Sequence, residues 1–449
     1  MKPKYLSRTT AVSLMLALPA GADVIYSNLK DIAIPTNFTG VYLDVDTGNW
    51  NTNINAPQSG WDVNPFFGGS SLWNSPGFQP VRSGTGEMDS VLNLAAGTTV
   101  GVGSVFSTFV QGPGGQNPGG PGYGYSESHM GNGVGQFVSG SEGYIGFRMT
   151  DGDYGWMRVV LTNNTGGALI KEWAYENSGA SIGVANIKRN GSTVTLDSVT
   201  GSFTVSSAII DSSGTTNLEK IASGTATLTG TNTYTGTTSV TAGTLVIASG
   251  GSTHASSAVT VSNSGSALVV NGTVNGTLLA NVSTTISGTG TVSGAATVNG
   301  NLNPGDNGTG LLTFGSSLTM ADTTLTTVEI NGMLLGIDYD AVNAAGALTY
   351  DGALALAMGA TFGTGTYTFN LFDFGSQTGS LDSVTLSGLY TGSLVNNGFG
   401  VWQAVTNSGT EIWAFTQSTG NLSLVVVPEP NVAALLGGIG LLFLLRRRR

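Results

Sequence analysis

The chain has 449 residues, of which 9% are charged, and it contains 69 glycines and no cysteine. Its formal net charge is −11, and no Lys or Arg occurs between Ile221 and Leu445. These figures exclude disulfide bonds and thiol chemistry, and they argue against a nucleic-acid partner, because phosphate binding needs clustered basic side chains.

Residues 1–22 have the pattern of a secretory signal peptide. Basic residues near Met1 precede a short apolar stretch, and Ala20-Gly21-Ala22 supplies the small residues of a cleavage site. Signal peptidase would cut between Ala22 and Asp23, so we expect a mature chain that begins at Asp23 and is exported across the inner membrane. A buried apolar helix is the alternative.

Residues 23–187 are predicted to form the first folded region. This region holds 20 Phe, Tyr and Trp residues, and its apolar residues alternate with small or polar ones, as in Gly143–Met149 and Tyr154–Leu161. A period of two indicates half-buried strands, whereas the Gly/Pro-rich stretch 111–124 indicates a loop. We therefore expect an antiparallel β-sandwich here.

Two pairs of closely spaced carboxylates in this region are candidates for calcium binding. Asp44 and Asp46 form one pair, and Asp151 and Asp153 form the other. Calcium loops space their oxygens in this way, but the twelfth position counted from Asp44 is Asn55 and not the Glu of an EF-hand. Asp also favours tight turns, so turn formation is the alternative explanation.

Aromatic and acidic side chains of the same region raise the question of carbohydrate chemistry. Exposed rings can stack on sugar faces, although such rings more often pack in a core, and two carboxylates that face one cleft can hydrolyse glycosides. The candidate rings are Trp50, Trp61, Trp73 and Tyr123, and the candidate carboxylates are Glu127, Glu142, Asp151 and Glu172. The sequence alone does not pair any of these carboxylates.

Other catalytic patterns are weak. The two histidines, His129 and His254, form no zinc-ligand motif. Gly179–Gly183 matches G-x-S-x-G, but residues 184–191 do not have the pattern of the helix that a nucleophile elbow needs. We therefore predict no catalytic residue, no metal site and no cofactor.

Residues 188–333 are repetitive. Only Tyr234 and Phe314 are aromatic between 221 and 333, and short runs of Val, Leu and Ile recur between glycines. The stretch Leu228–Leu245 contains L-T-G-T-N-T-Y-T-G and resembles the autotransporter-associated β-strand repeat. That resemblance implies short strands that turn at glycines and stack into a parallel β-helix, or solenoid.

A solenoid in this region would have a predictable number of rungs and a predictable set of inward-pointing side chains. Rungs of roughly 20 to 25 residues would give about six rungs. The side chains expected to point inward are Leu228, Val240, Leu245 and Ile247. A disordered Gly/Ser/Thr linker is the alternative.

Residues 334–426 regain aromatic side chains, 12 in all. A solenoid needs a terminal cap, because an open edge would pair with another chain. We therefore expect these residues to form an aromatic-rich cap.

Residues 427–449 have three parts in a fixed order. An uncharged stretch, Val432–Leu445, is long enough for about 21 Å of helix, which is short against a hydrocarbon core of about 30 Å. Before this stretch stand Pro428, Glu429 and Pro430, and after it stand Arg446, Arg447, Arg448 and Arg449. This order resembles the PEP-CTERM sorting signal, and Gly143–Ala185 is similar to an N-terminal domain that recurs in PEP-CTERM proteins.

The resemblance implies a route for the protein. In the PEP-CTERM family, a membrane enzyme called exosortase is thought to process the tail. The apolar helix would hold a precursor in the membrane, and the four arginines would stay on the cytoplasmic side. The Pro-Glu-Pro segment would be the sorting motif. A permanent membrane anchor is the alternative.

Together these features predict an all-β protein with an N-terminal antiparallel β-sandwich, a capped parallel β-helix and a C-terminal apolar helix. We expect an exported, non-enzymatic structural protein of the cell surface or extracellular matrix. A carbohydrate-binding module that attaches to surface polysaccharide is the second hypothesis, and a polysaccharide-active enzyme is the third.

Overall fold

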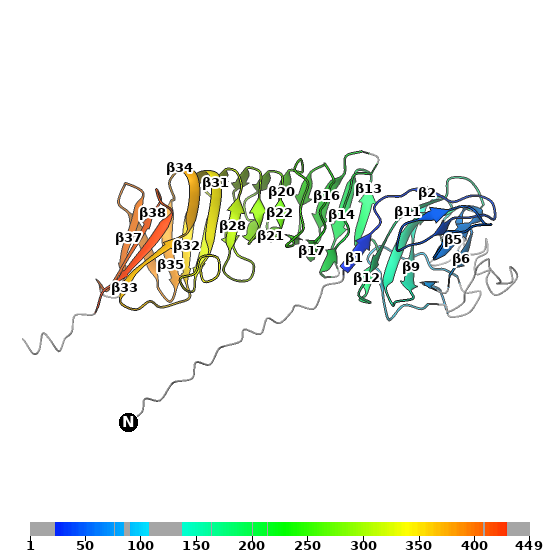
Figure 1. The fold of residues 1–449 in the computed structure, drawn as a ribbon, viewed down its shortest axis with the longest axis horizontal. Coiled ribbons are helices and arrows are strands. Elements are labelled where there is room, and N and C mark those ends of the chain that lie inside the picture. Colours follow the sequence, from blue (N-terminus) through cyan, green and yellow to red (C-terminus); the bar gives the residue numbers. More distant parts are fainter. Residues whose placement is uncertain are drawn as a thin grey trace, which may run out of the picture.

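The computed structural model describes residues 23–75, 77–84, 90–106, 137–162, 164–199, 201–212, 214–406 and 409–428. Their regular secondary structure consists of strands and of 3-10 turns such as η1 (Phe67–Gly69), and the remaining described residues form turns and loops. The expected all-β class is therefore confirmed. Figure 1 shows an elongated molecule with the N-terminal region at one end, a stack of strands in the middle and antiparallel strands at the other end.

The first region contains two antiparallel sheets and a short ribbon. The larger sheet has the order β7 (Phe78–Pro80), β9 (Glu142–Met149), β10 (Tyr154–Val160), β11 (Leu169–Glu176) and β1 (Asp23–Tyr26), with β2 (Ile32–Ala33) also paired to β11. The smaller sheet has the order β4 (Trp50–Asn51), β3 (Tyr42–Leu43), β5 (Val63–Phe66) and β6 (Ser71–Asn74). The ribbon pairs β8 (Thr99–Val100) with β12 (Ile182–Gly183).

One hydrophobic core joins the two sheets. Leu43 and Val63 of the smaller sheet belong to the same buried cluster as Phe147, Val159 and Trp173 of the larger sheet. The two sheets therefore bury apolar faces against a common core, as the alternating sequence pattern predicted.

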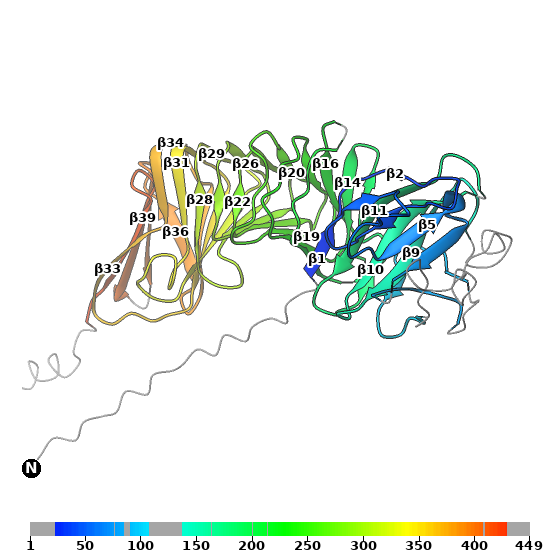
Figure 2. The same cartoon turned by 45° about the vertical axis from the view of Figure 1, so that its right-hand side comes forward.

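Strand β1 connects the first region to the stack of strands. It pairs antiparallel with β11 along one edge and parallel with β15 (Phe203–Val205) along the other. In Figure 2, β1 lies at the boundary between the two regions. One continuous sheet therefore passes from the first region into the stack.

The middle of the molecule is a parallel β-helix with three faces. Face one contains β15, β17 (Thr225–Leu228), β19 (Thr244–Ile247), β21 (Ala267–Val270), β24 (Thr285–Gly288), β27 (Asn301–Pro304), β30 (Leu325–Ile330), β32 (Ala353–Met358) and β35 (Ser383–Gly388). Face two contains β14 (Thr193–Asp197), β16 (Asn217–Ile221), β18 (Thr238–Val240), β20 (Val259–Val261), β23 (Leu278–Ala280), β26 (Ala296–Val298) and β29 (Leu318–Met320).

Face three is built from shorter pairings. It starts with single bridges from Thr231 to Ser252 and from Ser252 to Thr273. It continues through β22 (Thr273–Val274), β25 (Thr291–Val292) and β28 (Leu311–Phe314). At the start of the stack, β13 (Ile187–Asn190) pairs antiparallel with β14.

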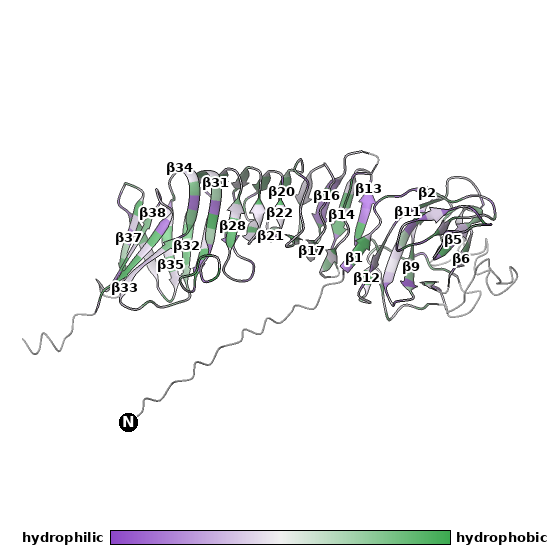
Figure 3. Cartoon of the chain, viewed as in Figure 1, coloured by the Kyte–Doolittle hydropathy of each residue, from purple (hydrophilic) through white to green (hydrophobic). Residues whose placement is uncertain are grey.

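The alternation of exposed and buried residues explains why these segments stack. Figure 3 shows hydrophilic and hydrophobic residues alternating along the strands. The four residues expected to point inward are all buried, at 1% exposure or less: Leu228, Val240, Leu245 and Ile247. The registers place aliphatic residues over aliphatic residues, for example Leu245 over Leu268 and Leu268 over Ile286. Burial of each such side chain contributes roughly 1.5–3 kcal/mol.

The stack is tighter and longer than the sequence predicted. Leu278 pairs with Ala296 and Ala296 with Leu318, which are steps of 18 and 22 residues. Face two from β14 to β29 therefore marks seven rungs where about six were expected. The parallel pairing then continues past residue 333, because β31 (Ala341–Tyr350) and β34 (Phe372–Gly379) each run along faces three and two.

Five antiparallel strands close the far end. They are β33 (Gly365–Asn370), β36 (Gly392–Asn396), β37 (Val401–Thr406), β38 (Glu411–Thr416) and β39 (Asn421–Val426). The aromatic side chains of the expected cap pack beneath them: Phe415 lies 6.0 Å from Phe372 and 6.4 Å from Tyr350, measured between ring centroids. The region 334–426 therefore contains two long rungs as well as the closing strands.

The expected C-terminal helix lies outside the described residues, which end at Pro428. Among the residues that are described, no helix has the length and apolarity needed to span a bilayer.

Candidate functional site

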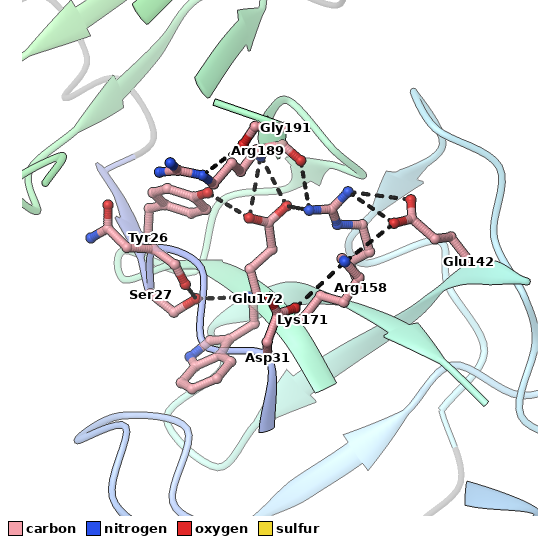
Figure 4. Close-up of polar contacts among 11 residues, drawn as sticks. Tyr26, Ser27, Asp31, Glu142, Arg158, Lys171, Glu172, Arg189 and Gly191 are labelled. Atoms are coloured by element: carbon pink, nitrogen blue, oxygen red, sulfur yellow. Dashed lines mark hydrogen bonds and ion pairs between the residues drawn. The ribbon is translucent and has the colours of Figure 1, made fainter. Parts of the chain in front are cut away.

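A buried polar cluster lies where the first region meets the stack (Figure 4). Glu172 on β11 is fully buried, and its Oε1 lies 2.9 Å from Nη2 of Arg158 on β10. The hydroxyl of Tyr26 on β1 donates to Glu172 Oε2 at 2.6 Å. The backbone nitrogen of Arg189 on β13 donates to the same carboxylate at 3.0 Å. One carboxylate thus joins β1, β10, β11 and β13.

Arg158 and Arg189 extend this cluster, which we call the junction network. Arg158 Nη2 donates to the carbonyl oxygen of Arg189 at 2.6 Å, and its Nη1 lies 3.2 Å from Glu142. The Arg189 side chain reaches into the stack, where Nη1 donates to Thr216 Oγ1 at 2.8 Å. At the solvent edge, Lys171 lies 3.6 Å from Glu142. The network therefore links the large sheet to the first rungs.

The electrostatics of the junction network favour a structural role. Burial raises the pKa of Glu172, while the Arg158 guanidinium and the Tyr26 hydroxyl oppose that rise. Burial and the adjacent Glu172 carboxylate raise the pKa of Tyr26 well above its ordinary value. A fully buried carboxylate with three donors cannot face a substrate cleft. In this conformation Glu172 is therefore not available as one of the candidate glycosidase carboxylates.

A second polar cluster brings together side chains from both predicted carboxylate pairs. Carboxylate oxygens of Asp44, Asp46 and Asp62 lie within 4.8 Å of one another. Asp151 of the other pair is close enough to raise the pKa of Asp46 and of Asp62 by charge repulsion, after the larger effect of burial. Asp62 comes from the start of β5 and was not predicted, because an isolated Asp before a strand has no distinctive pattern.

Both predicted pairs also form tight turns. Asp44 Oδ1 accepts a hydrogen bond from the Thr47 nitrogen at 2.9 Å, and Gly48 adopts a positive φ of 70° in that turn. Gly152, between Asp151 and Asp153, adopts a φ of 98°. The turn explanation is therefore observed at both pairs. Hard cations such as Ca²⁺ bind clustered carboxylate oxygens, so Asp44, Asp46 and Asp62 could hold one, as could Asp322, Asp351 and Asp382, the other such cluster among the described residues.

Three carboxyl groups with raised pKa values predict an unusual dependence of stability on pH. Burial raises the pKa of Asp62 to about 7, and it also raises the pKa of Asp340 to about 7 and that of Asp153 to about 6. In an unfolded chain the pKa of Asp is about 3.9. The folded chain therefore binds more protons between about pH 4 and pH 7, and its stability falls as the pH rises through that window.

We expect the melting temperature to be a few degrees higher at pH 5 than at pH 7.5, as measured by calorimetry. Asp62→Asn should reduce this difference, because the amide oxygen still accepts the Val45 N–H, which lies 2.8 Å from Asp62 Oδ2, but carries no charge. A melting temperature that rises from pH 5 to pH 7.5 would contradict the prediction.

The candidate sugar-stacking rings have different surroundings. Trp73 is buried at 4% exposure, with its ring 4.8 Å from that of Phe66. Trp61 packs edge-on against Tyr42 at 5.4 Å. Trp50 is 46% exposed, and Tyr123 lies outside the described residues. Core packing thus accounts for Trp61 and Trp73, and Trp50 is the described candidate that remains open to solvent.

The weaker catalytic patterns have structural explanations. After Ser181 the chain enters β12, a strand, where a nucleophile elbow would need a helix. His254 Nδ1 lies 2.8 Å from Ser256 Oγ within its own loop. His129 and Glu127 lie outside the described residues, so their placement stays untested.

The processing residues lie at the two ends of the described chain. Asp23 is the first residue of β1, whereas Ala22 lies outside the described residues. Pro428 is exposed two residues after β39 ends, and the nitrogen of Val427 donates to the carbonyl oxygen of Thr410 at 2.8 Å. Glu429, Pro430 and Arg446 to Arg449 also lie outside. The sorting motif is thus predicted, not observed, beyond Pro428.

The outer surface of face one carries a shallow groove of about 750 Å³. Its lining includes hydroxyl-bearing side chains, among them Thr225 and Thr244 on successive rungs and Thr285 two rungs further on, and loop residues 305–308 form one end. Such a surface offers neutral hydroxyl groups together with the acidic side chains of Asp306 and Glu329 as hydrogen-bonding partners.

Comparison with protein families supports the repeat assignment. The family model for the passenger-associated-transport-repeat matches residues 218–247, which contain two consecutive rungs from β16 to β19. The match confirms the part of the sequence resemblance that concerned the autotransporter-associated repeat. No curated protein matches the chain.

Proposed function

We propose that the chain is an exported, non-enzymatic structural protein of the cell surface or extracellular matrix. The observation that carries this proposal is the parallel β-helix around a passenger-associated-transport-repeat at residues 218–247. Repeats of this type fit transported passenger segments, and a stack of rungs makes a rigid rod. Each rung adds about 4.8 Å of length, so the stack holds the first region away from the tail.

The buried chemistry agrees with a structural role. The junction network places its most buried carboxylate, Glu172, between Arg158, Tyr26 and the Arg189 backbone, where it holds strands together. Asp44 and Asp46 of the carboxylate cluster lie in a tight turn, as do Asp151 and Asp153. Both arrangements hold elements of the fold in place, which supports a structural role.

The proposed route runs through both ends of the chain. Signal peptidase removes residues 1–22, and the apolar stretch 432–445 then holds the precursor in the inner membrane. An exosortase-like enzyme recognises the Pro-Glu-Pro motif, since proline prevents a regular helix or central strand there. Pro428 is exposed after the last strand of the cap, which supports access to this segment.

Glu429→Ala tests this route. The signal peptide should still be removed, but most of the chain should remain as uncleaved precursor in the inner-membrane fraction. Asp373→Ala, which also replaces a carboxylate side chain by a methyl group at an exposed position on β34, is the matched control and should be processed normally. Fractionation followed by mass spectrometry gives the result. Peptides from 432–446 in surface material would identify a permanent anchor and contradict the sorting proposal.

Polysaccharide binding is the second candidate, and two observations favour it. Trp50 is an exposed ring on the first region, and the groove on face one presents hydroxyl groups together with the side chains of Asp306 and Glu329. A glycan array with the folded chain separates the candidates: binding that is lost in Trp50→Ala would favour attachment to a polymer.

A further inference from the structure

The first strand of the fold begins with a contact between a backbone nitrogen and a buried carboxylate. The nitrogen of Asp23 donates to Glu176 Oε1 at 2.9 Å, and Glu176 is fully buried at the end of β11. The same carboxylate accepts from the nitrogen and hydroxyl of Ser178 at 3.0 and 2.6 Å, and from the nitrogen of Ala180 at 2.5 Å. All of these donors are neutral.

This carboxylate lacks a cationic partner among the residues that the structure describes. The ion pairs in that part of the chain involve Asp31, Glu142 and Glu172, but not Glu176. In addition, Asp23 Oδ1 is buried there without a hydrogen-bond partner. A buried carboxylate costs free energy unless a positive charge or several donors compensate for it. The surroundings of the Asp23 nitrogen therefore carry excess negative charge.

We propose that cleavage between Ala22 and Asp23 creates the missing cation. Water hydrolyses the peptide bond: the carbonyl carbon of Ala22 becomes the carboxylate of the released peptide, and the nitrogen of Asp23 becomes an α-amine that takes up the proton. Such an amine is largely protonated at pH 7. The resulting ammonium pairs with Glu176. This inference rests on the proposed removal of residues 1–22.

The number of hydrogens changes together with the charge. The Asp23 amide of the precursor has one hydrogen, which it donates to Glu176 Oε1. The ammonium has three, so it keeps that bond and offers two more donors to a site where Asp23 Oδ1 has no partner among the described residues. Cleavage thus replaces a hydrogen bond from a neutral amide by an ion pair, in which both the donor and the acceptor carry a charge.

The position of β1 makes this pair important for the whole molecule. Val24 lies opposite Glu176 in the pairing with β11 and opposite Val205 in the pairing with β15. The ammonium would therefore fix the strand that joins the first region to the stack. Removal of the signal peptide would complete this junction, so the exported form would be more stable than its precursor.

The test compares two forms of the chain that differ only at the N-terminus. One runs from Asp23 to Arg449 with a free amine, and the other keeps Ala22, so that the Asp23 nitrogen stays an amide. The form with the free amine should melt about 2–4 °C higher. In a Glu176→Gln background this difference should vanish, because the amide oxygen accepts a hydrogen bond but carries no charge. In the matched control, Glu142→Gln, the difference should persist.

A second measurement does not depend on the folding of the Gln variant. The Asp23 α-amine should react with an acylating reagent at least tenfold more slowly in the folded chain than in urea. Three results would each contradict the ion pair. These are equal melting temperatures of the two forms, a melting-temperature difference that persists in Glu176→Gln, and equal acylation rates in the folded chain and in urea.

The start of the exported protein is determined separately by mass spectrometry. If it begins at a residue other than Asp23, the inference fails for the native chain, even if the prepared chains form the pair. Export and tail processing are measured in separate experiments. Absence of the ion pair between Asp23 and Glu176 would therefore not contradict the proposed function.

Discussion

Replacing Glu172 by alanine should destabilise the chain by about 3–5 kcal/mol, the range found when one partner of a buried ion pair is removed. The change removes the acceptor for the Tyr26 hydroxyl and for the Arg189 nitrogen, and both donors lie in the interior. It also leaves the guanidinium of Arg158, 5% exposed, with only the outer carboxylate of Glu142 as an ionic partner among the described residues.

Urea unfolding followed by tryptophan fluorescence would measure this loss. Trp156 and Trp173 are fully buried on the strands that carry Arg158 and Glu172, so their emission reports on the junction. The matched control is Lys171→Met at the solvent edge of the same network. Partly exposed ion pairs contribute at most about 1 kcal/mol. The free energy of unfolding of this variant should therefore stay close to that of the unsubstituted chain.

A double variant separates charge from hydrogen bonding. Glu172→Gln combined with Arg158→Met removes both charges but keeps an acceptor for Tyr26 and for the Arg189 nitrogen. We expect the double variant to lose less free energy of unfolding than the sum of the losses in Glu172→Gln and Arg158→Met alone. The coupling energy should be about 1–3 kcal/mol. A loss below about 1 kcal/mol for Glu172→Ala would contradict a structural role for the network.

The periodic part of the fold was largely predictable from the sequence. Short apolar runs between glycines indicated stacked strands, and Leu228, Val240, Leu245 and Ile247 are buried as predicted. This works because each rung contacts its neighbours in a repeating way, so local alternation carries most of the information.

The end of the stack was harder to predict from the sequence. The rise in aromatic content after residue 333 indicated a cap, but it does not distinguish a closing strand from a wide rung. β31 and β34 each pair along two faces and carry aromatic residues such as Tyr350 and Phe372 inside the stack. Larger side chains fill the wider cross-section of these last rungs before the antiparallel strands begin.

The polar clusters depend on contacts between distant parts of the chain. The Tyr26 hydroxyl and Glu172 are 146 residues apart, and Asp23 and Glu176 are 153 residues apart. A single sequence has no pattern that pairs such positions, whereas Asp44–Asp46 and Asp151–Asp153 were visible because their spacing is local. The structure adds Asp62 to the first pair and brings both pairs into one electrostatic neighbourhood.

Gly276→Ala should destabilise the β-helix by at least about 3 kcal/mol, at the upper end of the cost of overpacking. Gly276 lies at the corner between faces three and two, just before β23. A Cβ atom there would stand 1.9 Å from the carbonyl oxygen of Ser257 and 2.6 Å from its carbonyl carbon. Both are backbone atoms of the preceding rung, so no side-chain rotation can relieve the clash, and the two rungs would have to move apart.

The same corner is crowded on neighbouring rungs, which makes the loss hard to absorb. A Cβ at Gly294 would stand 2.4 Å from the carbonyl oxygen of Gly276, so a shift of the Gly276 backbone would be transmitted to the next rung. The matched control is Gly363→Ala in the exposed loop before β33, where a Cβ would meet no atom within 4 Å. That change should be neutral or stabilise by up to about 1 kcal/mol, since alanine restricts the unfolded chain.

Thermal unfolding followed by circular dichroism compares the two variants. If Gly276→Ala melts at the same temperature as Gly363→Ala, the rungs can separate at little cost, and close packing at this corner does not explain why glycine stands there.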